Sequence, residues 1–164
     1  MEEKLAKEIY EKTEDSIYNL LGQHLEFDGL QQTMVYMHMR AYYIILVKLY
    51  LKAFNRNDIK FEEVFGNYKM ILINYYKENN PGIPEVLLND LIQSFDVSFQ
   101  LIESLELENV LVLDSLKKFT KEVLSNLHAI LERRSKKVIS TSFINNEKIF
   151  CDTAVIVKET CRNL

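Results

Sequence analysis

Residues 30–54 read LQQTMVYMHMRAYYIILVKLYLKAF, and this stretch decides the fold of the chain. Apolar residues cover most of the circumference that a helix of this sequence would have, among them Met34, Val35, Tyr42, Ile45, Leu46, Leu49 and Ala53. A helix that is apolar nearly all round is normally covered by other elements on every side. We therefore predict that this helix is the central one. It is not expected to span a membrane, because His38, Arg40 and Lys48 interrupt its apolar run.

Five further segments carry apolar residues at spacings of three and four, which is the period of an amphipathic helix. We expect these helices over residues 3–24, 59–78, 84–104, 109–135 and 146–162, with the central helix at 30–54. Asp58 is a candidate N-cap for the helix at 59–78. Residues 138–144, VISTSFI, favour a strand by composition, but no partner strand is evident and we expect an irregular connector. The sequence thus predicts an all-α, single-domain bundle of about six helices.

The composition is that of one ordinary globular domain. The chain has 164 residues, of which 48% are hydrophobic and 27% charged, with four glycines and two prolines. A chain of this length buries enough surface on folding to form a core without disulfides. Its first residues contain no apolar stretch of the kind found in a secretory signal peptide. We therefore expect a cytoplasmic protein in which Cys151 and Cys161 are unpaired.

Most enzyme classes lack their usual residues in this sequence. The glycines form no phosphate-binding loop, and no closely spaced His or Cys residues suggest a zinc site. No histidine follows a glutamate by three residues, as the histidines of di-metal helical bundles do. His38 is expected to be a neutral core histidine, and Cys151 a buried structural cysteine. We therefore assign no catalytic, cofactor-binding or metal-binding residue.

Tyrosines recur every seven residues on two of the predicted helices. Tyr36, Tyr43 and Tyr50 share one helical face, and Tyr68 and Tyr75 share a face of the next helix. Because tyrosine suits half-buried positions, the favoured interpretation is a seam between two neighbouring helices. The alternative is an exposed aromatic patch that binds a partner, since tyrosine is enriched at interfaces.

Charge is separated along the chain. Residues 81–114 carry seven acidic residues and no basic one, whereas residues 115–137 carry seven basic residues and two acidic ones. The basic residues of the predicted fifth helix include Lys117, Lys121, Arg133, Arg134, Lys136 and Lys137. The favoured interpretation is that the last of them complement the negative end of the helix dipole. The alternative is a docking site for an acidic protein or for nucleic-acid phosphates, and a pI near 5.5 argues against nucleic acid.

These features favour a non-catalytic helical module that acts by binding another protein, such as a regulator, an inhibitor or an immunity-type protein. Its candidate contact residues are the five tyrosines and the six basic residues named above. A homo-oligomer is compatible with the same surfaces. Two alternatives stay open: a small-molecule-binding or enzymatic bundle with a cavity near His38, and an accessory subunit that contacts nucleic acid through the basic fifth helix.

Overall fold

The computed structural model describes residues 1–134 and 146–164, and over these ranges the chain forms six α-helices and no strand. The helices are α1 (Glu2–Gln23), α2 (Gly29–Ala53), α3 (Phe61–Asn79), α4 (Glu85–Glu103), α5 (Leu113–Arg134) and α6 (Glu147–Arg162). The predicted all-α bundle is confirmed. The connector expected at 138–144 lies outside the described residues.

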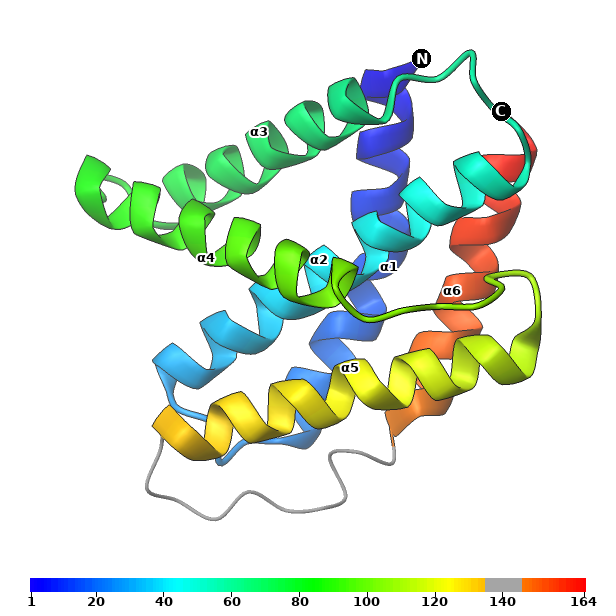
Figure 1. Cartoon of the computed structure of the whole chain (residues 1–164). Helices are drawn as coiled ribbons and strands as arrows, with labels where there is room; N and C mark the ends of the chain where they lie inside the picture. Colours follow the sequence, from blue (N-terminus) through cyan, green and yellow to red (C-terminus); the bar gives the residue numbers. More distant parts are fainter. Residues whose placement is uncertain (135–145) are drawn as a thin grey trace.

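Helix α2 lies at the centre of the bundle and contacts each of the other five helices (Figure 1). Its middle part, from Val35 to Val47, is buried without interruption. The helix begins with a capping box. The Asp28 carboxylate accepts a hydrogen bond from the Gln31 backbone N–H at 2.8 Å, and the Gln31 side chain accepts one from the Asp28 N–H at 3.0 Å. The prediction of a buried central helix is confirmed.

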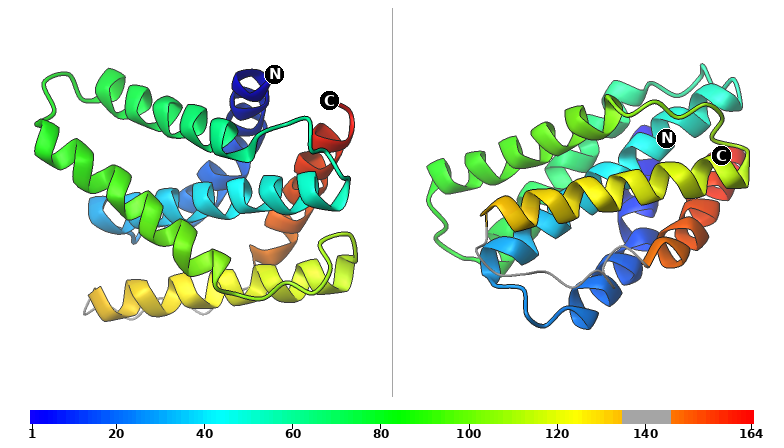
Figure 2. Two further views of the ribbon diagram at one scale, coloured as in Figure 1. Left: turned by 45° about the horizontal axis from the view of Figure 1, so that its top comes forward. Right: turned by 60° about the horizontal axis from the view of Figure 1, so that its bottom comes forward.

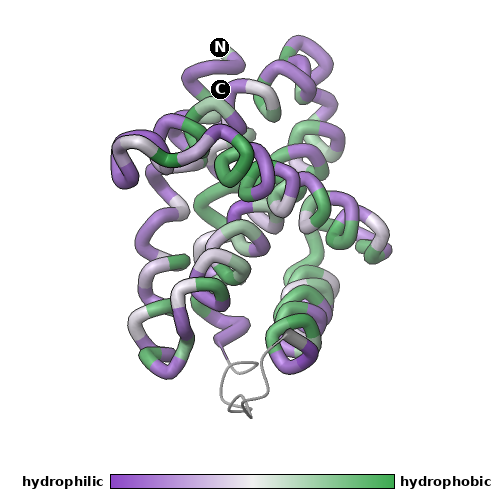
Figure 3. Tube along the Cα trace, turned by 90° about the vertical axis from the view of Figure 1, so that its left-hand side faces the viewer, coloured by the Kyte–Doolittle hydropathy of each residue, from purple (hydrophilic) through white to green (hydrophobic). Residues whose placement is uncertain are grey.

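The remaining helices cover α2 from several directions (Figure 2). α1 and α6 pack against α2 and against each other, and α5 packs against α6 and α2. α3 and α4 form a hairpin in which α3 packs mainly on α1, and α4 mainly on α2. Hydrophobic and hydrophilic segments are interspersed along the helices (Figure 3), as amphipathic patterns require. The two ends of the chain lie at the same end of the molecule (Figure 1).

Five of the six helices begin and end within two residues of the predicted positions. The exception is α5, which begins at Leu113 and not at residue 109. The side-chain oxygen of Asn109 accepts a hydrogen bond from the Leu111 N–H at 2.9 Å, and its carbonyl accepts one from the Val112 N–H at 3.2 Å. An asparagine that bonds its own backbone in this way favours a turn over a helix.

The start of α3 also differs from prediction. Asp58 does not cap this helix, whose N-cap position is Lys60, and no side chain caps it. The Asp58 carboxylate instead accepts a hydrogen bond from the Arg56 guanidinium at 2.9 Å. The Asp58 carboxylate, which the sequence suggested as the N-cap of α3, is therefore engaged in this ion pair.

Candidate functional site

Most of the predicted contact tyrosines lie inside the bundle. Four of the five are at most 4% exposed: Tyr36, Tyr43, Tyr50 and Tyr68. The hydroxyl of Tyr36 bonds with that of Tyr10 at 2.6 Å, and the hydroxyl of Tyr43 bonds with Ser16 Oγ at 2.6 Å. The ring of the half-buried Tyr75 stacks on Tyr36 with 5.3 Å between centroids. These four tyrosines are residues of the seams between helices, and they do not form an exposed aromatic patch.

The tyrosines of α1, α2 and α3 surround a buried arginine that sequence reasoning did not single out. Arg40 is fully buried, and its Nη1 donates to the Tyr10 carbonyl at 2.7 Å and to Thr13 Oγ1 at 3.0 Å. Its guanidinium carbon lies 3.8 Å from the ring centroid of Tyr10 and 5.1 Å from that of Tyr36. Such distances allow a cation–π attraction. No carboxylate of the described residues forms an ion pair with Arg40, so tyrosine rings and backbone oxygen compensate its charge.

The groups with the potential for acid–base or nucleophilic chemistry are also in the core. His38 is 1% exposed, and burial lowers the pKa of its ring to about 4, although a hydrogen bond with the backbone of Val123 acts in the opposite direction. Cys151 and Cys161 are unpaired and buried. Burial raises the pKa of the Cys161 thiol to about 12 and also raises that of Cys151. The imidazole and both thiols are therefore neutral at physiological pH, where a neutral thiol is a weak nucleophile.

The basic residues of α5 whose side chains the structure describes are exposed. Lys117, Lys121 and Arg133 are exposed, and Arg134 is the last residue of α5. The other two predicted contact residues, Lys136 and Lys137, lie outside the described ranges. These exposed basic residues are interspersed along α5 with the exposed acidic residues Glu122 and Glu132, and they are separate from the buried tyrosines.

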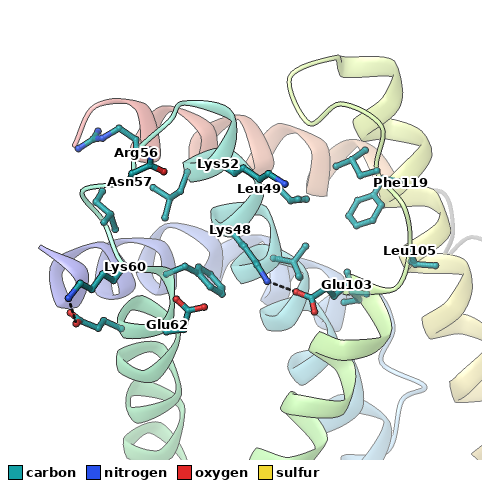
Figure 4. A pocket seen from close by; sticks show the side chains of 17 residues that line it. Lys48, Leu49, Lys52, Arg56, Asn57, Lys60, Glu62, Glu103, Leu105 and Phe119 are labelled. Carbon is teal, nitrogen blue, oxygen red and sulfur yellow. Dashed lines mark hydrogen bonds and ion pairs between the residues drawn. The ribbon is translucent and has the colours of Figure 1, made fainter.

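A groove that sequence analysis did not identify has a volume of about 670 Å³ and opens at the surface (Figure 4). It lies where the end of α2 meets the start of α3, the end of α4 and the early part of α5. Its apolar lining includes Leu49, Ile59, Phe61, Leu105, Leu107 and Phe119. Four helices and two connections contribute to it, so the groove exists only in the folded bundle.

The turn after α2 builds one wall of the groove. Asn55 has a φ of 53°, and the N–H of Arg56 donates to the Leu51 carbonyl at 2.9 Å while that of Asn55 donates to the Lys52 carbonyl at 3.1 Å. These two bonds form a Schellman motif, in which asparagine tolerates the left-handed position better than most residues. The turn reverses the chain and returns Ile59 to the core, where it is 5% exposed.

Charges of opposite sign stand on the two sides of the groove. Lys52 and Arg56 lie on the α2 side, and Glu62 lies on the other, in the first turn of α3, beside Glu63 and Lys60, which are 3.8 Å apart (Figure 4). A lysine in the last turn of a helix and a glutamate in the first turn each complement the dipole of their own helix. The charges of Lys52 and Glu62 are therefore stabilised by their own helices even when no partner is bound.

An ion pair lies between these two sides. Lys48 Nζ is 2.7 Å from Glu103 Oε2, so the pair joins α2 to α4 (Figure 4). The same ammonium lies 5.6 Å from the ring centroid of Phe61. The pair is neutral as a whole, and it leaves the rest of the groove lining largely apolar.

Among the described residues, no group of three or more His, Cys, Asp or Glu side chains is placed to hold a metal ion. No helix in the same ranges is long and apolar enough to cross a membrane. No family model matches the chain, and neither the curated proteins nor the solved structures contain a significant match to it.

Proposed function

We propose that this protein is a non-catalytic module that binds another protein through the groove at the end of α2. The observation that carries the proposal is the groove itself, with an apolar lining inside a charged rim. Protein interfaces have this composition, with a dry apolar centre and a polar edge that stays in contact with water. A groove that opens at the surface also suits a segment of a partner chain better than an enclosed metabolite, most of whose surface would need to be covered.

The distribution of reactive groups favours binding over catalysis. The imidazole of His38 and the thiols of Cys151 and Cys161 are buried and held neutral. None of these three residues belongs to the lining of the groove. The groove instead offers apolar side chains, ammonium groups, a guanidinium and carboxylates, which are the groups that position a partner.

The test compares how well two variants capture partners. In each variant glutamine replaces one apolar side chain, inside the groove in one and outside it in the other. Leu107→Gln changes the groove lining, and Ile83→Gln changes an aliphatic residue of the α3–α4 connection. Both residues are half-buried in connections between helices, so the two substitutions are matched in burial. Tagged wild type and both variants are used to recover partners from native extract of the source cells.

We expect Leu107→Gln to reduce recovery of the wild-type partner at least ten-fold, while Ile83→Gln recovers it normally. Circular dichroism must show the same helix content and melting for both variants. Equal recovery by the two folded variants would contradict the proposed groove. Recovery of nucleic acid in place of a protein would contradict the proposed function.

A further inference from the structure

The opposite charges along the rim of the groove restrict what can occupy it. Lys52 is exposed and forms no ion pair within the described part of the chain, and the same holds for Glu62 on the other side. Arg56 pairs with Asp58, which is itself exposed, and Glu63 is 3.8 Å from Lys60. The ammonium of Lys52 and the carboxylate of Glu62 are thus available to a ligand in the folded protein.

We propose that the groove holds one amphipathic α-helix of a partner protein, with carboxylates along one flank and cations along the other. This inference rests on the proposed function and names the chemistry of the partner. The apolar face of the helix lies on Leu49, Phe61 and Leu107. Its acidic flank lies along Lys52 and Arg56, and its basic flank lies along Glu62.

A helix matches the spacing of the basic side. Lys48 and Lys52 stand one turn apart on α2, with Lys48 paired to Glu103, whereas Arg56 follows the turn after α2. A partner helix that lies along α2 repeats its own side chains at the same interval of one turn. Apolar anchors at positions i, i+3, i+4 and i+7 then face the lining, as in other helix-in-groove complexes.

The rim also selects the direction of the bound helix. Turning a helix end for end while its apolar face stays on the groove exchanges its left and right flanks. An acidic flank that must meet Lys52 therefore allows one direction only. Charged rims contribute more to specificity of this kind than to affinity, because exposed charges are well solvated in the free protein.

The experiment uses three designed helical peptides of about 15 residues that share one leucine face and differ only in their flanks. The first carries Glu on one flank and Lys on the other, the second Glu on both, and the third Lys on both. Binding to the whole chain is measured by fluorescence anisotropy at low salt. We expect the two-signed peptide to bind about ten-fold more tightly than either single-signed peptide.

A matched pair of protein variants tests whether the rim is responsible. Lys52→Glu and Lys77→Glu each reverse an exposed lysine in the last turn of a helix, but Lys77 is in α3, away from the groove. Lys52→Glu is expected to weaken binding of the two-signed peptide about three- to five-fold and to strengthen binding of the Lys-only peptide. Lys77→Glu is expected to change neither.

Direction is tested with a spin label on the N-terminus of the two-signed peptide. NMR signals should broaden at one end of the groove, near Asn57 or near Leu105. A peptide with exchanged flanks should broaden the signals at the opposite end. Broadening at the same end by both peptides would overturn the proposed orientation by charge.

Three further results would overturn the inference. The first is equal affinity of the three peptides, and the second is equal effects of Lys52→Glu and Lys77→Glu. The third is saturable binding of oleate that displaces every peptide, which would assign the groove to a single-chain amphiphile. If Leu107→Gln still abolishes capture of the native partner while the three peptides bind equally, the proposed function stands and only the charged helix fails.

Discussion

The guanidinium of Arg40 lies 3.8 Å from the ring centroid of Tyr10, and this contact joins the central helix α2 to α1. Tyr68 places its ring edge-on to that of Tyr10 at 5.8 Å, which extends the cluster to α3. The buried hydroxyl of Tyr68 interacts with Arg40 and Thr13, but neither this hydroxyl nor Nε and Nη2 of Arg40 makes a hydrogen bond of good geometry among the described residues. Unpaired buried polar atoms lower stability, so the cluster specifies how three helices meet without being an optimal source of stability.

The first prediction concerns the net contribution of this guanidinium. Arg40→Met keeps most of the side-chain volume and removes a buried cation that has no carboxylate partner. We expect the free energy of unfolding to stay within about 1 kcal/mol of wild type or to rise. Arg40→Ala leaves a cavity and is expected to cost about 2 to 5 kcal/mol. Urea denaturation measures both. An equal loss in the two variants would show that the guanidinium itself stabilises the fold.

The second prediction is a dependence of stability on pH that comes from His38. Its pKa is about 4 in the folded protein, against an ordinary value of about 6.5 when unfolded, so the unfolded state binds the proton more tightly. The stabilising effect of the neutral ring is complete above pH 6.5 and is lost as pH falls from 6.5 toward 4. The loss is roughly 2 to 3 kcal/mol by pH 4.5.

The control for this effect is His38→Gln, which removes the titrating ring but leaves every carboxylate in place. The difference in unfolding free energy between wild type and this variant should move in favour of the variant as pH falls from 7 to 4.5. A difference that is constant over this range would show that His38 does not titrate between the two states.

The third prediction concerns the core of α2. Ile45 is 2% exposed and Leu46 is fully buried. Truncating either one to alanine should cost about 2 to 5 kcal/mol, because the surrounding side chains close the resulting cavity only in part. Val97→Ala, at a position on α4 that is 57% exposed, is the matched control and should be nearly neutral. Chemical denaturation of the three variants gives the comparison.

The sequence predicts the helices well because each is specified by a periodic pattern within one segment. The apolar circumference of residues 30–54 is enough to place α2 at the centre, since no other position covers all its faces. The start of α5 is harder to predict, because it depends on how the Asn109 side chain bonds to its own backbone. Propensity and periodicity alone do not show that bond.

The tyrosines that recur every seven residues show what periodicity cannot predict, which is whether their shared face is buried or exposed. A repeat of seven residues places Tyr36 and Tyr43 on one face of α2, whether that face meets solvent or another helix. These tyrosines are buried because α1 and α6 pack against α2, and α3 packs against α1 and α2. A seven-residue repeat carries no information about which helices pack on that face. The buried position of Arg40 is hard to predict for a similar reason. Its charge suggests a surface position, whereas the Tyr10 carbonyl and two aromatic rings accept it in the core.

The groove is not predictable from the sequence because its lining comes from separate segments. Leu49, Ile59, Leu105 and Phe119 belong to α2, to the turn after it, to the connection after α4, and to α5. No single segment shows which residues stand opposite it. The one local signal is the interval of four between Lys48, Lys52 and Arg56 at the end of an apolar helix, followed by Glu62.

The last prediction separates the groove from the exposed basic residues of α5. Lys121 borders a hollow of about 390 Å³ that shares Leu105 with the groove, so it lies next to the proposed binding site. Arg133 is twelve residues further along α5, or about 18 Å at 1.5 Å per residue. A rim charge beside the site affects association mainly at low salt, because screening limits its reach to about 10 Å at 0.1 M.

Lys121→Glu is therefore expected to slow association with the native partner by a few-fold at low salt and to have little effect at high salt. Arg133→Glu should leave the association rate unchanged at low and at high salt. Surface plasmon resonance at several salt concentrations measures these rates. Simultaneous reversal of Arg133, Arg134, Lys136 and Lys137 tests the alternative docking site. If this quadruple variant does not bind while its melting temperature stays within a few degrees of wild type, the docking surface is the basic end of the fifth helix. Normal binding by Leu107→Gln in the same assay would in addition exclude the groove from recognition of that partner.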